Sequence, residues 1–400
     1  MIEHILLALL LGITIGIITG TLPGLHVNLI AVIVLSLSPL LLQLASPLLL
    51  AVFLISLAIT HTFLDALPSI YLGAPDESQA LNVLPGHRLL LRGKGHLAIL
   101  WITFGSFGSL LLSILLLPLF IFLMKIISSW AQVIVVYLLL GIVLFLLWKE
   151  QKKIPAFCIF LLAGTLGILV FDLPLQQPLF PLLSGLFGCS LLLMSLLKKT
   201  NIPAQNINFN NSKFPLKKNL ALISGASFSG FLAAFLPGVS TSQVAVFGAA
   251  VLKKMGDVGF LTFVGGVSTA NMLISLGTLY ALEKARNGAI VAVQELLPKV
   301  QLQEVLLFSG VALTAGGIAC MATLWLSKKF CKILPKINYP LLIKFVLCFI
   351  ALLVLFIDGP LGILVLAVAT ALGIMATSWG IAKHHLMGCL LVPVILYFIL

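Results

Sequence analysis

Long apolar runs alternate with short polar segments along the whole chain. Many of the runs are close to the roughly 20 residues that a helix needs to cross a bilayer, and glycine, proline or charged residues separate them. The pattern predicts helical segments at about 47–72, 97–123, 130–148, 154–171, 179–197, 258–282, 305–327, 340–357, 360–379 and 384–399, together with helix hairpins at about 4–44 and 219–252. The sequence therefore predicts an all-α, polytopic integral membrane protein.

A proline–glycine pair splits each predicted hairpin. The first break contains Leu22-Pro23-Gly24, and the second contains Leu236-Pro237-Gly238. Proline removes a backbone donor and glycine lowers helix propensity, so each pair predicts a helix break with unpaired backbone groups. Within a membrane such a break is tolerated only where protein or a wet cavity covers it.

The two breaks also relate two halves of the chain. When the first Pro-Gly pair is aligned with the second, Gly16 falls on Gly230 and Asn28 falls on Ser242. This match predicts an internal repeat. The predicted parts are a first membrane half at 1–197, a hydrophilic linker at 198–218 and a second membrane half at 219–400, with the repeats at about 4–123 and 219–327.

The composition agrees with a membrane protein. Hydrophobic residues make up 61% of the chain and charged residues only 8%, against about a quarter in a soluble domain. The net charge of +12 comes from Lys and Arg in short loops, as the positive-inside bias predicts, so we expect no nucleic-acid partner. The six cysteines form no CxxC pair and are expected to be small core residues.

The basic loops also predict the sidedness of the chain. If the loop at 148–153 and the linker are cytoplasmic, the turn at 172–178 lies outside, provided that each hairpin enters and leaves on one side. The other segments predicted inside are 88–94, 253–254, 328–336 and 383–384, and those predicted outside are 358–360 and the N-terminus. The first repeat then starts outside and the second inside. This is the inverted-topology arrangement of secondary transporters, here in the cytoplasmic membrane.

The residues that follow the breaks form a candidate anion site. A half-helix that starts after a break presents N–H groups and the positive end of its dipole, which favour a carboxylate or phosphate. The candidate substrate-binding residues are Pro23, Gly24, His26, Asn28, Pro237, Gly238, Ser240, Thr241, Ser242, Gln243 and Asn271. A single hydroxyl in a membrane helix often bonds only to a carbonyl, and His26 alone could be a core histidine bonded to a carbonyl.

Ionisable residues within apolar runs are the candidates for ion coupling. These candidates are His61, Thr62, Asp65, Asp76, Glu77 and Ser78. His61 and Asp65 are four residues apart and share a helix face, where they could bind H⁺ or Na⁺ or form a structural pair. Capping of a short helix accounts for Asp76 and Glu77 equally well. Arg88 is expected to be a cytoplasmic anchor, although it could also meet an anionic substrate.

Several other function classes lack their motifs. No GxxxxGK[ST] and no strand-led GxGxxG is present, which argues against an ATP-driven pump. His384-His385 is only a weak metal motif, because no HExxH pattern and no neighbouring carboxylate accompanies it. We therefore predict no metal, no cofactor and no catalytic residue. A membrane-embedded lipid-phosphate phosphatase is a third hypothesis, for which only His61 and Asp65 could begin to serve.

Four segments, at 20–25, 70–80, 84–89 and 92–95, resemble the large permease of tripartite tricarboxylate transporters, the TctA-like family. The resemblance is best over 10–110 and 220–275, and the remaining spans match only in hydropathy. His26 and Asn28 stand where bacterial permeases of this family tend to have small residues and threonine. These departures bear on the substrate more than on the fold.

The resemblance implies an ion-coupled transporter of organic anions such as carboxylates. In bacteria such permeases work with a small membrane subunit and a periplasmic binding protein, and a homo-oligomer is also compatible with the sequence. The paired Pro-Gly motifs are also similar to those of polyprenyl-phosphate flippases. The sequence therefore leaves a lipid phosphate as the alternative substrate.

Overall fold

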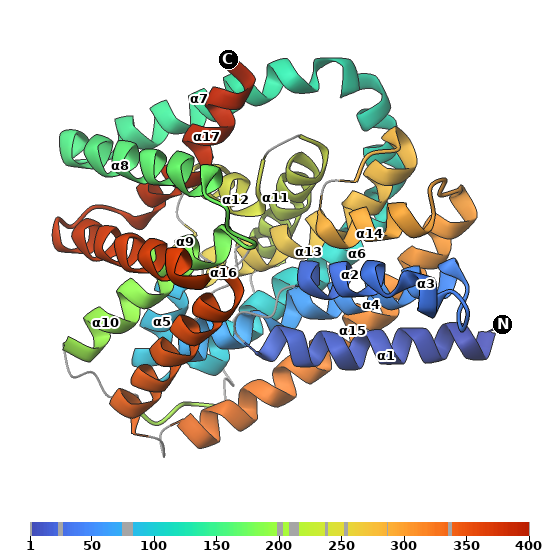
Figure 1. The fold of residues 1–400 in the computed structure, drawn as a ribbon, viewed down its shortest axis with the longest axis horizontal. Coiled ribbons are helices and arrows are strands. Elements are labelled where there is room, and N and C mark those ends of the chain that lie inside the picture. Colours follow the sequence, from blue (N-terminus) through green and yellow to red (C-terminus); the bar gives the residue numbers. More distant parts are fainter. Residues whose placement is uncertain are drawn as a thin grey trace.

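The structure is a computed structural model that describes residues 2–22, 27–73, 83–197, 203–207, 216–236, 239–251, 255–285, 287–334 and 338–399. Over these residues the chain folds into helices joined by short turns, and they contain no β-strand (Figure 1). The predicted all-α fold is confirmed.

The first half contains helices α1 to α10. Their bounds are α1 Ile2–Thr21, α2 Val27–Ser36, α3 Ser38–Leu41, α4 Pro47–Leu64, α5 Val83–Leu91, α6 Gly95–Ile127, α7 Ala131–Lys149, α8 Lys153–Asp172, α9 Leu179–Leu183 and α10 Ser190–Leu197. Two π-helical turns, η1 at Pro68–Leu72 and η4 at Ser184–Cys189, extend α4 and join α9 to α10, and the 3₁₀ turn η3 covers Ser128–Trp130.

The second half contains helices α11 to α17. Their bounds are α11 Leu216–Phe235, α12 Thr241–Val251, α13 Gly256–Leu282, α14 Gly288–Leu296, α15 Leu302–Ile333, α16 Tyr339–Ser378 and α17 Gly388–Ile399, with the 3₁₀ turn η6 at Lys383–Met387. Gly359 interrupts α16 with a φ of 68° and a ψ of −160°. The predicted break between the spans at 340–357 and 360–379 is therefore present.

Eight of the described helical segments are long and apolar enough to cross a membrane. They are Ile2–Thr21, Pro47–Leu72, Gly95–Trp130, Lys153–Asp172, Leu179–Leu197, Gly256–Leu282, Leu302–Ile333 and Pro340–Ser378. Shorter apolar helices cover Val136–Lys149, Asn219–Phe235 and Lys383–Ile399. The predicted multi-pass membrane protein is confirmed.

Glycines allow the long helices to cross at close range. A Cβ atom added to Gly16 on α1 would lie 2.7 Å from the carbonyl oxygen of Leu57 on α4. At the aligned position in the second half, a Cβ on Gly230 of α11 would lie 2.6 Å from the Cβ of Ala270 on α13. The two aligned glycines therefore have the same packing role, because small residues let membrane helices approach closely.

The two halves also pack into each other. Helix α6 of the first half crosses α13, and helix α15 of the second half packs against α4. A Cβ on Gly265 of α13 would lie 2.7 Å from the carbonyl oxygen of Ile102 on α6, and one on Gly316 of α15 would lie 3.6 Å from Cε2 of Phe63 on α4. The first half thus contacts the second through α6 on α13 and through α4 on α15, while the repeat and its inverted orientation stay predictions.

Several polar contacts join loops that the sequence places on the same side of the membrane. Three of these contacts lie on the predicted cytoplasmic side: Arg88 binds Asp257, Lys152 donates to the Trp379 carbonyl, and the Asn206 N–H donates to the Gly93 carbonyl. The fourth lies on the predicted outer side, where the Gln177 N–H donates to Asp358. The donor–acceptor distances are 2.7 to 2.8 Å. The grouping of these loops agrees with the predicted topology.

The inverted repeat makes a direct prediction for cysteine labelling. In a background without the native cysteines, we expect His4→Cys to react with an impermeant maleimide on intact cells, and Lys217→Cys to react only after permeabilisation. Both positions are exposed, at corresponding starts of the two repeats. Gln176→Cys and Gln151→Cys, at the two ends of α8, are the outside and inside controls. Labelling of His4→Cys and Lys217→Cys from the same side would exclude the inversion.

Candidate functional site

One cavity gathers candidate residues from both halves of the chain. It has a volume of about 270 Å³. Its polar lining comes from Asn28, His61, Thr62 and Asp65 of the first half and from Ser240, Thr241, Ser268, Asn271 and Asn287 of the second. Seven residues predicted to bind the substrate or the coupling ion therefore line one cavity, although they are far apart in the sequence. They are Asn28, His61, Thr62, Asp65, Ser240, Thr241 and Asn271.

Three helices begin at this cavity. The first residues of α2, α12 and α14 are Val27, Thr241 and Gly288, and all three line it. These helices have 10, 11 and 9 residues. The first N–H groups of an α-helix have no partner within the helix, and the dipole places partial positive charge there. The three helix starts together favour an anion.

A capping box fixes the start of α12. The Ser240 N–H donates to Oε1 of Gln243 at 3.0 Å, and the Gln243 N–H donates to Oγ of Ser240 at 3.3 Å. Gln243 and Ser242 are buried and do not line the cavity, whereas Ser240 and Thr241 do. Of the four consecutive polar residues, two face the cavity, and Gln243 holds the helix start in place.

Hydroxyl groups join the two halves beside the cavity. Thr62 on α4 and Thr269 on α13 lie with their Oγ1 atoms 3.2 Å apart, and Thr62 Oγ1 also donates to the carbonyl of Ile59 at 2.8 Å. Ser268 and Asn271, on the same helix as Thr269, line the cavity. The Thr62–Thr269 contact therefore positions α4 and α13 as opposite walls of one site.

The cavity also contains the predicted ion-coupling pair. His61 and Asp65 both line it from the end of α4, and they are only 4% and 3% exposed. Nδ1 of His61 lies 3.1 Å from Oγ1 of Thr19 on α1. A carboxylate at membrane depth is costly unless protein groups, a proton or a cation stabilise it, so it is a candidate for ion binding. The geometry thus places a group suited to a cation beside helix starts suited to an anion.

Helix α14 supplies residues that the sequence analysis did not select. No helix is predicted between the segments at 258–282 and 305–327, but Asn287 and Gly288 line the cavity. Oδ1 of Asn287 caps α14 by accepting from the Ile290 N–H at 3.0 Å. Its Nδ2 is buried and has no acceptor among the described residues. The detectable signal is an Asn-Gly pair that precedes a short apolar run, because asparagine is a preferred N-cap.

Gly288 allows α14 to reach the first hairpin. A Cβ atom at Gly288 would lie 2.5 Å from Oδ1 of Asn28. The Asn28 side chain on α2 thus lies directly against the start of α14. This contact brings two of the three helix starts together across the boundary between the halves.

Some predicted site residues do not contribute to the described site. Arg88 binds Asp257 at 2.7 Å and does not line the cavity. The adjacent His87 is buried, and this burial lowers the pKa of its imidazole to about 4. Eight predicted site residues lie outside the described part of the chain, and for them the assignments stay predictions: Pro23, Gly24, His26, Asp76, Glu77, Ser78, Pro237 and Gly238.

Comparison with known proteins identifies the family. The family described as "Tripartite tricarboxylate transporter TctA family" matches residues 6–388. The chain belongs to this family. It is also 30% identical to an uncharacterized protein of Methanocaldococcus jannaschii, in an alignment that covers 98% of this chain and 99% of that protein. No solved structure matches the chain.

Family membership confirms the resemblance that the sequence motifs indicate. The match runs through both predicted repeats and nearly to the end of the chain, beyond the segments that carry the motifs. The chain is therefore a multi-pass membrane component of a transporter family.

The cap of α14 predicts a stability difference between two substitutions of Asn287. We expect Asn287→Ala to lower the free energy of unfolding by about 1 kcal/mol, because it removes the N-cap acceptor, whereas Asn287→Ser keeps an acceptor. The measurement is the thermal midpoint of the purified protein in detergent. Equal midpoints for the alanine and serine variants would contradict the capping role.

Proposed function

We propose that this protein is an ion-coupled secondary transporter of a small carboxylate anion, and that the cavity is its substrate site. The observation that carries the proposal is the convergence of α2, α12 and α14, whose first residues all line one cavity together with a buried carboxylate. The family description adds tricarboxylates as the first substrates to test.

The lining favours an anion that binds and leaves readily. Asp65 is the only acidic residue, and there is no Lys or Arg, among the described residues that line the cavity. An anion would be held by helix N–H groups, by the hydroxyls of Ser240 and Thr241 and by amide groups, which are those of Asn28, Asn271 and Asn287. Such a site avoids a permanent ion pair with the substrate. Its volume of about 270 Å³ lies just below the ~300–1,000 Å³ usual for small-molecule pockets, which favours a small anion.

Asp65 provides the physical reason for ion coupling. Two negative charges ~8 Å apart repel by about 2 kcal/mol at an effective dielectric constant of ~20. An anion in the cavity therefore binds better when Asp65 carries a proton or a sodium ion, and the cation binds better when the anion is present. His61, in the same lining, is the second candidate for contact with the coupling ion.

Transport would proceed by alternating access between the two halves, with no covalent step. The paired glycine crossings and the reciprocal packing of α6 with α13 and α15 with α4 support two related halves around the site. The protein would act in the cytoplasmic membrane. A small membrane subunit and a binding protein outside the membrane are the partners that a tripartite system implies.

Asp65→Asn tests the coupling role. In proteoliposomes reconstituted with the purified protein, we expect citrate uptake to be driven by an inward H⁺ or Na⁺ gradient. The asparagine variant should lose that dependence because its side chain cannot ionise. Asp172→Asn, at the exposed end of α8, is the matched control and should keep gradient-driven uptake. Uptake by Asp65→Asn that still follows the gradient would exclude this role for Asp65.

Asn287 tests the substrate side of the proposal. Asn287→Ser and Asn287→Asp both keep an N-cap acceptor, so α14 should stay folded. Loss of the Nδ2 donor should weaken citrate binding about ten-fold or more, and the added charge in the aspartate variant should weaken it further.

Isothermal titration of citrate, with undecaprenyl phosphate as competitor, measures this effect. Citrate binding that neither variant changes would refute the cavity as the substrate site. Binding of the lipid phosphate without citrate binding would replace the carboxylate by a lipid carrier.

A further inference from the structure

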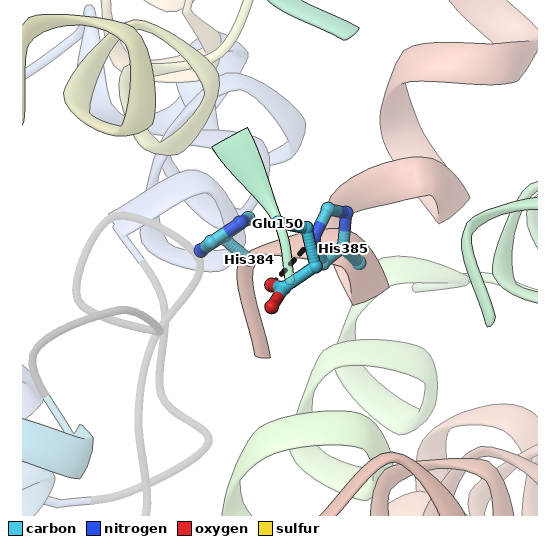
Figure 2. Close-up of side chains that lie close together, drawn as sticks. All are labelled: Glu150, His384 and His385. Atoms are coloured by element: carbon cyan, nitrogen blue, oxygen red, sulfur yellow. Dashed lines mark hydrogen bonds and ion pairs between the residues drawn. The ribbon is translucent and has the colours of Figure 1, made fainter. Parts of the chain in front are cut away.

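A second cluster of polar side chains lies apart from the cavity. Glu150 directly follows α7, and His384 and His385 belong to η6, so the cluster joins two segments that are far apart in the sequence. One donor atom from each of these residues lies within 4.8 Å of the others. Figure 2 shows the three side chains together, with the Glu150 carboxylate joined to the imidazole of His385. None of the three lines the transport cavity.

The local backbone brings the three residues together. Glu150 follows the last turn of α7 with extended backbone angles, φ −76° and ψ 139°. Gly380 adopts a φ of 69°, which a residue with a side chain rarely adopts, and it turns the chain from α16 towards η6. Nζ of Lys152 donates to the carbonyl of Trp379 at 2.8 Å. This hydrogen bond links the turn between α7 and α8 to the turn between α16 and η6.

The donors are partly shielded from solvent. His385 is 1% exposed and Glu150 is 16% exposed, and Nε2 of His385 lies 3.1 Å from Oε2 of Glu150. The rings of His384 and His385 have their centroids 4.3 Å apart. Two imidazoles and one carboxylate at this spacing can converge on a single ion with small side-chain rotations.

Nearby lysines do not occupy the cluster. The ammonium of Lys383 is buried and donates to Oγ of Ser190 at 3.0 Å, and that of Lys152 is bound to the Trp379 carbonyl. The ammonium of Lys149 lies 6.0 Å from the centroid of the Phe145 ring, and Lys153 is exposed. The carboxylate of Glu150 therefore faces histidines rather than an ammonium group.

We propose that Glu150, His384 and His385 bind a divalent transition-metal ion of the zinc class. Two histidine nitrogens and one carboxylate oxygen are a usual ligand set for Zn²⁺, and water completes its tetrahedron. With neutral imidazoles the set carries one negative charge, so the bound site carries one positive charge. This site is absent from the sequence prediction because the carboxylate comes from a residue 235 positions away from His385.

The proposed ion has a structural role. It joins the turn between α7 and α8 to η6, which leads directly into α17. Helix α17 packs closely on α8, where a Cβ atom at Gly167 would lie 1.9 Å from the carbonyl oxygen of Cys389. A metal ion at η6 thus fixes the start of α17 against α8, at a place where the helix packing tolerates little displacement.

Metal titration of the full chain tests the site. Purified protein is stripped with a chelator, its thiols are blocked with N-ethylmaleimide, and Zn²⁺ is added in a calorimeter. We expect one ion per chain and a higher thermal midpoint with Zn²⁺, because a ligand that binds only the folded state stabilises it. Co²⁺ should give the visible absorption bands of a low-symmetry nitrogen–oxygen site.

Matched variants decide the assignment. Glu150→Gln and His384→Gln should each abolish the saturable Zn²⁺ site and the Co²⁺ bands, whereas His4→Gln, at the exposed start of α1, should keep both. Asp65→Asn should also keep both, so the result does not depend on the transport proposal. Absence of saturable binding to the wild-type chain, or unchanged binding to both cluster variants, would overturn the proposal.

Discussion

The constraint on which this structure depends is the cost of exposing backbone polar groups within a membrane. A helix break leaves N–H groups without partners, and hydrocarbon provides none. Here three helix starts, at α2, α12 and α14, lie around one cavity. Because the three helix starts share one cavity, their unpaired N–H groups face a single polar site and are not exposed separately to hydrocarbon. The caps of Ser240 with Gln243 and of Asn287 satisfy part of these groups, and the cavity-facing ones favour an anion.

Close helix packing brings the three starts together. Aligned glycines at 16 and 230 seat α1 on α4 and α11 on α13, and the two halves then exchange contacts through α6 and α15. In the same way Gly288 lets Asn28 lie against the start of α14. Without a hydrophobic driving force between helices in lipid, such close approach is a main source of association. The geometry of the site is thus a consequence of small residues at the crossings.

The apolar pattern and the polar residues within it were sufficient to predict the helical membrane fold, the break at 358–360 and the cavity positions of Asn28, His61, Asp65 and Ser240. Three other features depend on spatial detail that periodicity does not encode. Ser242 and Gln243 turn away from the cavity because consecutive helical residues point in different directions. Asn287 precedes a helix of only 9 residues, which is too short for its 3.6-residue hydrophobic period to be detected easily in the sequence. Glu150 meets His385 only through the folded chain.

Cysteine protection tests most directly whether an anion sits where the helix starts converge. Ala58 and Ala289 line the cavity from opposite halves, and their side chains carry no polar group. In a background without the native cysteines, Ala58→Cys and Ala289→Cys are exposed to a small anionic methanethiosulfonate in the presence and absence of citrate. We expect citrate to slow the modification of both cysteines, because it would occupy the cavity that they line. Modification of both at unchanged rates under saturating citrate would contradict a citrate site in this cavity.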